Sequence, residues 1–197
     1  GRSGSTALVS LLNSVASIHC DGEILNKRVL FPYAHVLAKC GNSRSPVYGC
    51  KILTYQIRRV QPIDDREDFI RRLYRDNFKI IYLKRGNLVQ HALSNMRARA
   101  FSFSQKNTDE QIYGKLTVDL NDLLRWIKGS ESGHAYEKLL LEGIPHLSLT
   151  YEDHIASGEK HQETADLVCR YLDVESSEVK TEYRKVSPRT LRDSVAN

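Results

Sequence analysis

The sequence lacks several features by which whole classes of protein are recognised. No stretch approaches the roughly 18 consecutive apolar residues of a membrane-spanning helix, so we expect no membrane span. Only 8% of the residues are aromatic and the basic residues are scattered, which argues against a nucleic-acid-binding module. No signal peptide is visible, although the chain begins at Gly1 rather than Met, so a removed leader segment stays open.

Cysteine is scarce and shows no metal-binding pattern. The four cysteines form no C-x-x-C pair and have no partner histidine at zinc spacing. We therefore predict no metal site and interpret the cysteines as small buried hydrophobic residues in a reducing compartment, which indicates a cytoplasmic protein. A Cys40–Cys50 disulfide is the alternative.

The composition is that of an ordinary globular protein. The chain has 197 residues, of which 41% are hydrophobic and 27% charged, and we expect one domain over residues 1–197. The net charge of +5 is uneven, because residues 1–98 hold 16 Lys and Arg against 7 Asp and Glu. An excess of positive charge in one half of the chain predicts an anionic partner.

Strand and helix patterns alternate along the chain. Short apolar runs predict buried strands at Val47–Leu53, Lys79–Leu83 and His146–Thr150. Helical periodicity predicts helices at residues 6–14, 29–39, 66–76, 88–100, 120–128 and 161–172. This alternation predicts an α/β fold, a parallel sheet with helices on both faces. Because a glycine-rich loop in such a fold follows a strand, we expect the first strand to precede Gly1.

A glycine-rich loop opens the sequence. Residues 1–6 read GRSGST and an apolar helix follows directly. Glycines let the backbone approach an anion closely, and the amides of a helix N-terminus point at it. The ATPase P-loop is excluded because Gly4 is followed by Ser5 rather than lysine, although a plain helix cap stays an alternative. The predicted anion-binding residues are Arg2, Ser3, Gly4, Ser5 and Thr6.

A second candidate anion site lies at the end of a later strand. Arg85 follows the strand at 79–83, and Ser94 lies on the next helix. Ligands bind at the carboxyl ends of the strands in open α/β sheets, and a guanidinium and a hydroxyl can together hold a phosphate. Lys84 is the alternative cation, and a surface arginine with a solvent-facing serine is the alternative interpretation.

Glu23 is the candidate general base. It follows Gly22 after the first helix, and transfer of a group to a hydroxyl requires an acceptor for the hydroxyl proton. His19 and His35 are alternatives, because neutral histidine is a common base. Lys51 lies within a predicted strand and is expected either to face the site or to extend to solvent.

These segments resemble those of sulfotransferases that use 3′-phosphoadenosine-5′-phosphosulfate, in the carbohydrate and bacterial polysaccharide–glycolipid branch. The RSGST string at residues 2–6 resembles the 5′-phosphosulfate loop, and Arg85 with Ser94 resembles the 3′-phosphate signature, although the nine-residue interval exceeds the common eight. The string at 22–25, GEIL, is similar to the family segment that carries the proposed base. The family often has a lysine at the place of Lys51.

The resemblance implies a P-loop-like three-layer fold with a central parallel sheet, and a sulfuryl transfer that needs no metal. It implies that Arg2 and residues 3–6 hold the phosphosulfate and that Arg85 and Ser94 hold the 3′-phosphate. Glu23 would accept the proton from a sugar or lipid-linked hydroxyl, and Lys51 would assist the reaction.

Two further segments match the family. The basic run near the C-terminus resembles a loop that closes over the nucleotide, with Lys185 and Arg189 at the matching positions. Tyr151-Glu152-Asp153 resembles a string that is structural, and the variable middle, Phe101–Tyr136, is a candidate acceptor region. A P-loop-type kinase and a non-catalytic anion-binding module are the alternative functions.

Overall fold

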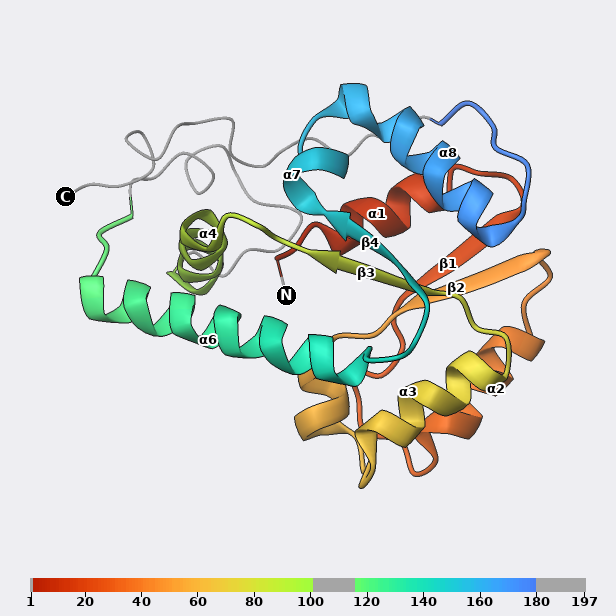
Figure 1. The fold of residues 1–197 in the computed structure, drawn as a ribbon, viewed down its shortest axis with the longest axis horizontal. Coiled ribbons are helices and arrows are strands. Elements are labelled where there is room, and N and C mark those ends of the chain that lie inside the picture. The colour runs from red at the N-terminus through yellow and green to blue at the C-terminus, as the bar shows by residue number, and fades with distance from the viewer. Residues whose placement is uncertain (1, 101–115, 180–197) are drawn as a thin grey trace.

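Strands and helices alternate in the computed structural model, which describes residues 2–100 and 116–179 (Figure 1). The strands are β1 (Ile18–Glu23), β2 (Val47–Lys51), β3 (Ile80–Lys84) and β4 (His146–Thr150). The helices are α1 (Ser5–Leu12), α2 (Pro32–Gly41), α3 (Arg66–Arg75), α4 (Leu88–Ala100), α6 (Leu120–Leu140), α7 (Tyr151–His154) and α8 (His161–Leu172). A π-helical turn, η1 (Gln56–Val60), and a 3-10 turn, η2 (Gly158–Lys160), complete the described elements.

All strand pairing among the described residues is parallel. β1 pairs with β2, with Ile18 opposite Val47, and β3 pairs with β4, with Ile80 opposite His146. The α/β class is therefore confirmed. The described strands form two two-stranded sheets rather than the single central sheet that was expected.

Local sequence accounts for most element boundaries. Pro32 occupies the first helical position of α2, where its missing N–H costs nothing, and the Asp65 carboxylate caps α3 by accepting from the Asp68 amide at 2.8 Å. The helix predicted at residues 120–128 continues to Leu140. Gly129 and Gly133, both poor helix formers, conceal that continuation in the sequence.

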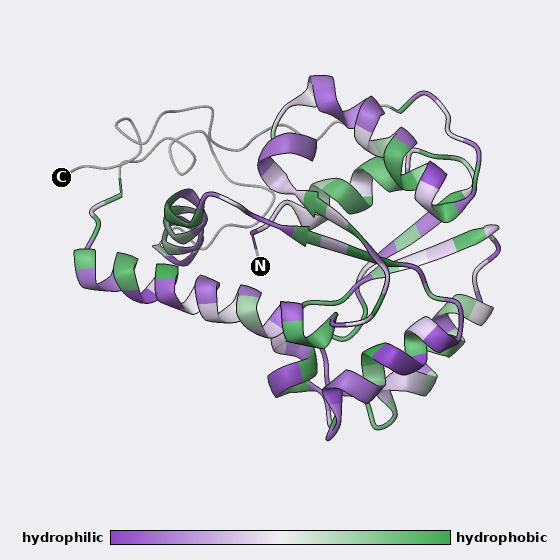
Figure 2. Cartoon of the chain, in the orientation of Figure 1, coloured by the Kyte–Doolittle hydropathy of each residue, from purple (hydrophilic) through white to green (hydrophobic). Residues whose placement is uncertain are grey.

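Two apolar cores hold the helices against the strands. The first lies between the strands and the pair α1 and α8, and its most buried members include Leu11, Val15, Leu149 and Val168. Green apolar segments line this region in Figure 2. The second core joins α2, α3 and η1 beneath β2, and contains Leu25, Val36, Ile57, Phe69, Leu73 and Leu140. Each large apolar side chain buried in this way contributes about 1.5–3 kcal/mol, so these cores fix the strand ends in place.

The four cysteines are unpaired, and the alternative Cys40–Cys50 disulfide is not formed. Burial raises the pKa of the Cys20 thiol to about 11 and that of Cys50 to about 12. Thiols with such pKa values are weak nucleophiles at neutral pH. Cys20 and Cys169 are buried as predicted, whereas Cys40 and Cys50 are only partly buried.

Among the described residues, no helix combines the length and apolar character needed to cross a bilayer.

Candidate anion-binding and catalytic site

The N-terminus of α1 is the meeting point of segments from all four strands. Lys51, the last residue of β2, contacts Thr6, and Arg85, the residue after β3, contacts Arg2. Glu23 ends β1 and pairs with Lys51, while Tyr151 follows β4 and packs against Gly4. Because parallel strands end at the same edge, the fold gathers these residues around one loop, where α/β proteins bind ligands.

The loop before α1 requires glycine at position 4. Gly4 has φ +88°, and a β-carbon there would lie 2.5 Å from a ring carbon of Tyr151. Arg2 also adopts a left-handed conformation, with φ 67°. Gly4 caps α1 without any side-chain hydrogen bond, so no cap side chain occupies the first-turn amides. The loop therefore has the close backbone approach and the amides that an anion cradle requires.

Lys51 links the loop to the candidate base. Its Nζ donates to Thr6 Oγ1 at 3.1 Å and lies 2.9 Å from Glu23 Oε1. Its side chain is only 12% exposed, so it does not extend to solvent; it faces the loop. The structure thus brings Lys51 and Glu23 together beside Thr6.

Two neighbours that the sequence analysis missed hold the other oxygen of Glu23. Gln56 Nε2 donates to Glu23 Oε2 at 3.0 Å, and the Tyr55 hydroxyl donates to it at 3.4 Å. Gln56 is fully buried, and its own Oε1 accepts from the Leu53 amide at 2.8 Å. The Glu23 carboxylate is consequently oriented by three donors, while its side chain stays 28% exposed.

Arg85 is a buried cation whose donors are loosely held. It is 8% exposed, and its guanidinium lies over the Tyr151 ring at 4.4 Å. Its Nη1 and Nη2 make bonds of 3.4 Å to Arg2 O and Gln90 Oε1, and its buried Nε has no hydrogen-bond partner in the described part of the chain. Burial lowers the pKa of Arg85, because desolvation disfavours the charged form. Such a guanidinium has donor capacity left for an anion.

Glu152 braces the turn that carries Arg85. Its carboxylate accepts from the amides of Gly86 and Asn87 at 2.9 and 3.0 Å and lies 3.8 Å from Arg85 Nε. Burial alone would raise the pKa of Glu152, but these amide bonds and the nearby guanidinium lower it below its ordinary value. Tyr151 and Glu152, predicted to be structural, thus support Arg85 directly.

The two predicted anion anchors touch each other. Arg2 Nε donates to Ser94 Oγ at 3.3 Å, so the loop before α1 and the helix α4 lie side by side. Lys84, the alternative cation, is only partly buried and ends β3 opposite Thr150. Arg85 rather than Lys84 contacts the loop in the described structure.

The remaining predicted residues are the two alternative bases and the two C-terminal cations. The alternative base His19 is half exposed and faces Asp21 at 3.3 Å. His35 lies on α2. Lys185 and Arg189 fall outside the described residues.

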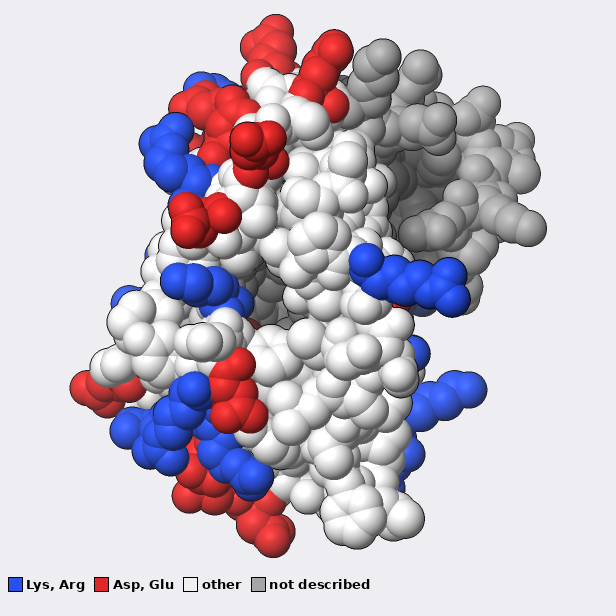
Figure 3. Space-filling model, turned by 90° about the vertical axis from the view of Figure 1, so that its right-hand side faces the viewer, with Lys and Arg blue, Asp and Glu red and all other residues white. Residues whose placement is uncertain are grey.

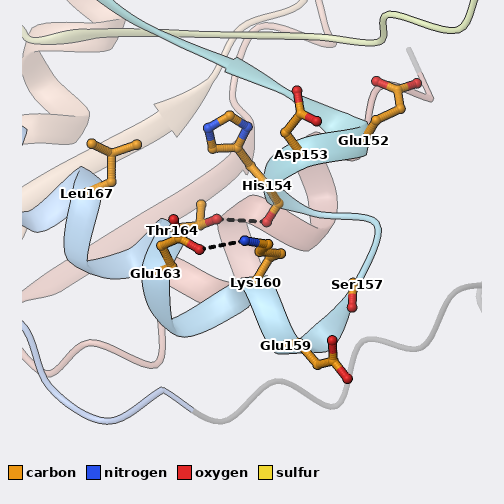
Figure 4. A pocket seen from close by; sticks show the side chains of 9 residues that line it. All are labelled: Glu152, Asp153, His154, Ser157, Glu159, Lys160, Glu163, Thr164 and Leu167. Carbon is orange, nitrogen blue, oxygen red and sulfur yellow. Dashed lines mark hydrogen bonds and ion pairs between the residues drawn. The ribbon is translucent and has the colours of Figure 1, made fainter.

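A hollow of about 420 Å³ near α7 and α8 contains none of the predicted site residues (Figure 4). Acidic side chains dominate it, and Lys160 there pairs with Glu163 at 2.9 Å. The Thr164 hydroxyl donates to the carbonyl of His154 at 2.8 Å. The side chains that line this hollow are Glu152, Asp153, His154, Ser157, Glu159, Lys160, Glu163, Thr164 and Leu167. This acidic lining makes it unsuited to an anion.

The surface charge of the face in Figure 3 is mixed. Basic and acidic side chains are interspersed along one side of this face, and a broad uncharged area separates them from a few basic side chains at the opposite edge. On α3, Arg72 lies over the Tyr33 ring at 4.0 Å and Arg75 lies 3.9 Å from Asp68. These arginines have local partners of their own.

Within residues 2–100 and 116–179, no three His, Cys, Asp or Glu side chains are grouped as metal ligands.

No family model, curated protein or solved structure matches the chain.

Proposed function

We propose that the chain is a sulfotransferase that moves a sulfuryl group from 3′-phosphoadenosine-5′-phosphosulfate to a hydroxyl of a carbohydrate or glycolipid. The proposal includes a P-loop-like three-layer fold and a cytoplasmic location. One observation carries it: cations from two strand ends contact the glycine-rich loop before α1. Lys51, which pairs with Glu23, donates to Thr6, while Arg85 donates to the carbonyl of Arg2, whose side chain donates to Ser94. Cations for two phosphates and a carboxylate base thus surround one helix N-terminus.

The donor fits the residues present. The close approach at Gly4 and the first-turn amides of α1 suit the 5′-phosphosulfate, with Arg2 and Lys51 as the adjacent cations. Buried Arg85, whose Nη1 and Nη2 make only long bonds of 3.4 Å, would hold the 3′-phosphate together with Ser94. When the donor binds, its phosphate oxygens replace Ser94 Oγ as the acceptor for Arg2 Nε, and the Ser94 hydroxyl is then able to donate to a phosphate as well.

Glu23 and Lys51 divide the chemistry between them. The donor supplies an activated sulfuryl group, whose sulfur–oxygen bond to phosphate breaks as the acceptor oxygen bonds to sulfur. Glu23 takes the proton of that acceptor hydroxyl. Lys51, together with the loop amides, stabilises the negative charge that develops on the leaving phosphate oxygen. Gln56 and Tyr55 keep the Glu23 carboxylate in place.

Calorimetry with two nucleotides that differ in one group tests the donor assignment. We expect 3′-phosphoadenosine-5′-phosphate to bind at least about tenfold more tightly than adenosine 5′-phosphate, because a charge-assisted phosphate contact contributes about 1.5–3 kcal/mol. Equal affinities for the two nucleotides would rule out the assignment of a 3′-phosphate site to Arg85 and Ser94. Magnesium-dependent binding of ATP in preference to both would favour a kinase, and heparin retention without nucleotide binding would favour an anion-binding module.

Glu23→Gln tests the base. The substitution keeps the size of the side chain and removes the proton acceptor, so turnover should fall about 10²–10⁴-fold with donor-product binding unchanged. Unchanged turnover would exclude Glu23 as the base.

A further inference from the structure

Beside Glu23 the surface forms a second hollow, of about 440 Å³. It lies between the end of β1, the turn that follows and α2. Its nine lining residues are Asp21, Gly22, Glu23, Ile24, Asn26, Lys27, Val29, His35 and Lys39. Ligand-binding hollows commonly have volumes of about 300–1,000 Å³, so this one has room for a small saccharide.

Glu23 connects this hollow with the phosphate loop. One of its oxygens faces Lys51, which in turn donates to Thr6, and the same residue lines the hollow. None of the predicted donor-binding residues Arg2 to Thr6, Arg85 or Ser94 lines it. Glu23 is therefore shared by the hollow and the Lys51–Thr6 contact, and the predicted donor-binding residues leave the lining of the hollow free.

The acidic side chains that line the hollow have partners within the described structure, whereas its two lysines have no ion-pair partner there. Both acidic side chains are engaged, Glu23 with Lys51 and Asp21 with the Tyr48 hydroxyl at 3.0 Å and with His19 at 3.3 Å. Lys27 and Lys39 are exposed and make no ion pair with the described residues. The half-buried ring of His35 lies on the same wall.

We propose that this hollow binds the acceptor, and that the acceptor is a saccharide carrying a carboxylate, phosphate or sulfate group next to the reacting hydroxyl. This inference rests on the proposed function. The two lysines provide the charge that recognises the anionic substituent, and the Asn26 side chain offers the amide donors and acceptor that sugar hydroxyls use. A neutral sugar would bring no opposite charge to either ammonium group.

The test measures saccharide binding by calorimetry in the full chain saturated with 3′-phosphoadenosine-5′-phosphate. Methyl glucuronide and glucose 6-phosphate serve as anionic probes, and methyl glucoside and glucose as their neutral counterparts. At low ionic strength we expect the anionic member of a pair to bind about tenfold more tightly, since contacts to exposed charges are modest in water. The preference should shrink at high salt, because the lysines are exposed to screening.

The variant Lys27→Ala/Lys39→Ala should lose this preference and keep its affinity for the donor product. Lys128→Ala/Lys138→Ala removes the same charge from α6, outside the hollow, and should keep the preference. The inference is overturned if neutral sugars bind as well as anionic ones, if no probe binds, or if the preference survives in the first variant. Donor-product binding is measured first, in a separate titration of each variant without saccharide, so a failure of the donor assignment is distinguished from a failure of the acceptor assignment.

Discussion

Arg2 and Ser94 are 92 positions apart in the sequence, and Arg2 Nε donates to Ser94 Oγ at 3.3 Å. This contact joins the loop that precedes α1 to the helix that follows β3. It places residues from the two candidate phosphate sites in direct contact.

Removing Arg2 and Ser94 together should have a non-additive effect. Each single alanine variant should weaken binding of 3′-phosphoadenosine-5′-phosphate, and the double variant should lose less than the two single losses combined. Residues in direct contact show coupling of about 0.5–3 kcal/mol, and this exposed bond belongs at the lower end. The measurement is a double-mutant cycle by calorimetry. Arg44, an exposed arginine, replaces Arg2 in a control cycle with Ser94, where the effects should add.

Gly4 and Gly143 form a matched pair for testing the loop. Both have positive φ, +88° and +70°, so alanine at either position should cost about 1–2 kcal/mol of unfolding free energy. Only at Gly4 does a β-carbon meet a neighbour, the Tyr151 ring at 2.5 Å, whereas nothing lies within 4 Å at Gly143. Gly4→Ala should therefore cost roughly 1–3 kcal/mol more in urea unfolding, as overpacking does. Equal costs would mean that the loop and Tyr151 are not in close contact.

Gln56 should act as a positioning residue for Glu23. In Gln56→Leu the Glu23 carboxylate loses the donor at 3.0 Å, so we expect kcat to fall about tenfold while donor-product affinity is kept. Leucine also leaves the Leu53 amide without its 2.8 Å acceptor, which should lower the unfolding free energy by about 1–3 kcal/mol.

Gln61→Leu is the control for that stability loss. Gln61 is also buried, and its side chain donates to the carbonyls of Leu25 and Lys27 at 2.7 Å. In the described part of the chain its side chain makes no hydrogen bond to Glu23. Gln61→Leu should destabilise the protein. Because Gln61 holds the turn that lines the second hollow, the substitution should also change the KM for the acceptor. If kcat fell as much in Gln61→Leu as in Gln56→Leu, the fall in kcat would follow from lost stability, and Gln56 would not be a positioning residue for Glu23.

Glu152 should make the protein sensitive to acid. The amides of Gly86 and Asn87 hold its folded-state pKa below the ordinary value, so its contribution to stability is present above that ordinary value. The contribution is lost as pH falls through the lowered folded-state pKa. The difference in unfolding free energy between wild type and Glu152→Gln should therefore be largest near about pH 7 and shrink towards about pH 3. A difference that stays constant with pH would contradict the assignment.

Sequence patterns predicted the elements that have strong periodicity. The strand at 146–150 and the helices at 88–100 and 161–172 lie where they were expected, because the spacing of their hydrophobic residues marks them. β1 was missed, since Asp21 and Gly22 are poor strand formers and the segment gains its stability from pairing with β2.

The candidate site was predictable only where a residue type carried its own signal. Gly4, Arg85 and Glu23 stand out because glycine at a helix start, a cation after a strand and a carboxylate beside glycine are informative locally. Gln56 carries no such signal: its role depends on a π-helical turn that places its amide against a carboxylate 33 positions earlier. Contacts of this kind come from tertiary packing, which a single sequence does not display.

The most direct test of the account is calorimetric titration of the folded, full-length protein with 3′-phosphoadenosine-5′-phosphate. The account predicts saturable binding to the wild type and a loss of at least about tenfold in affinity for Arg85→Ala/Ser94→Ala. It predicts little change for Lys84→Ala, because Arg85 rather than Lys84 contacts the glycine-rich loop before α1. Absence of binding, or equal affinity in the double variant, would contradict it.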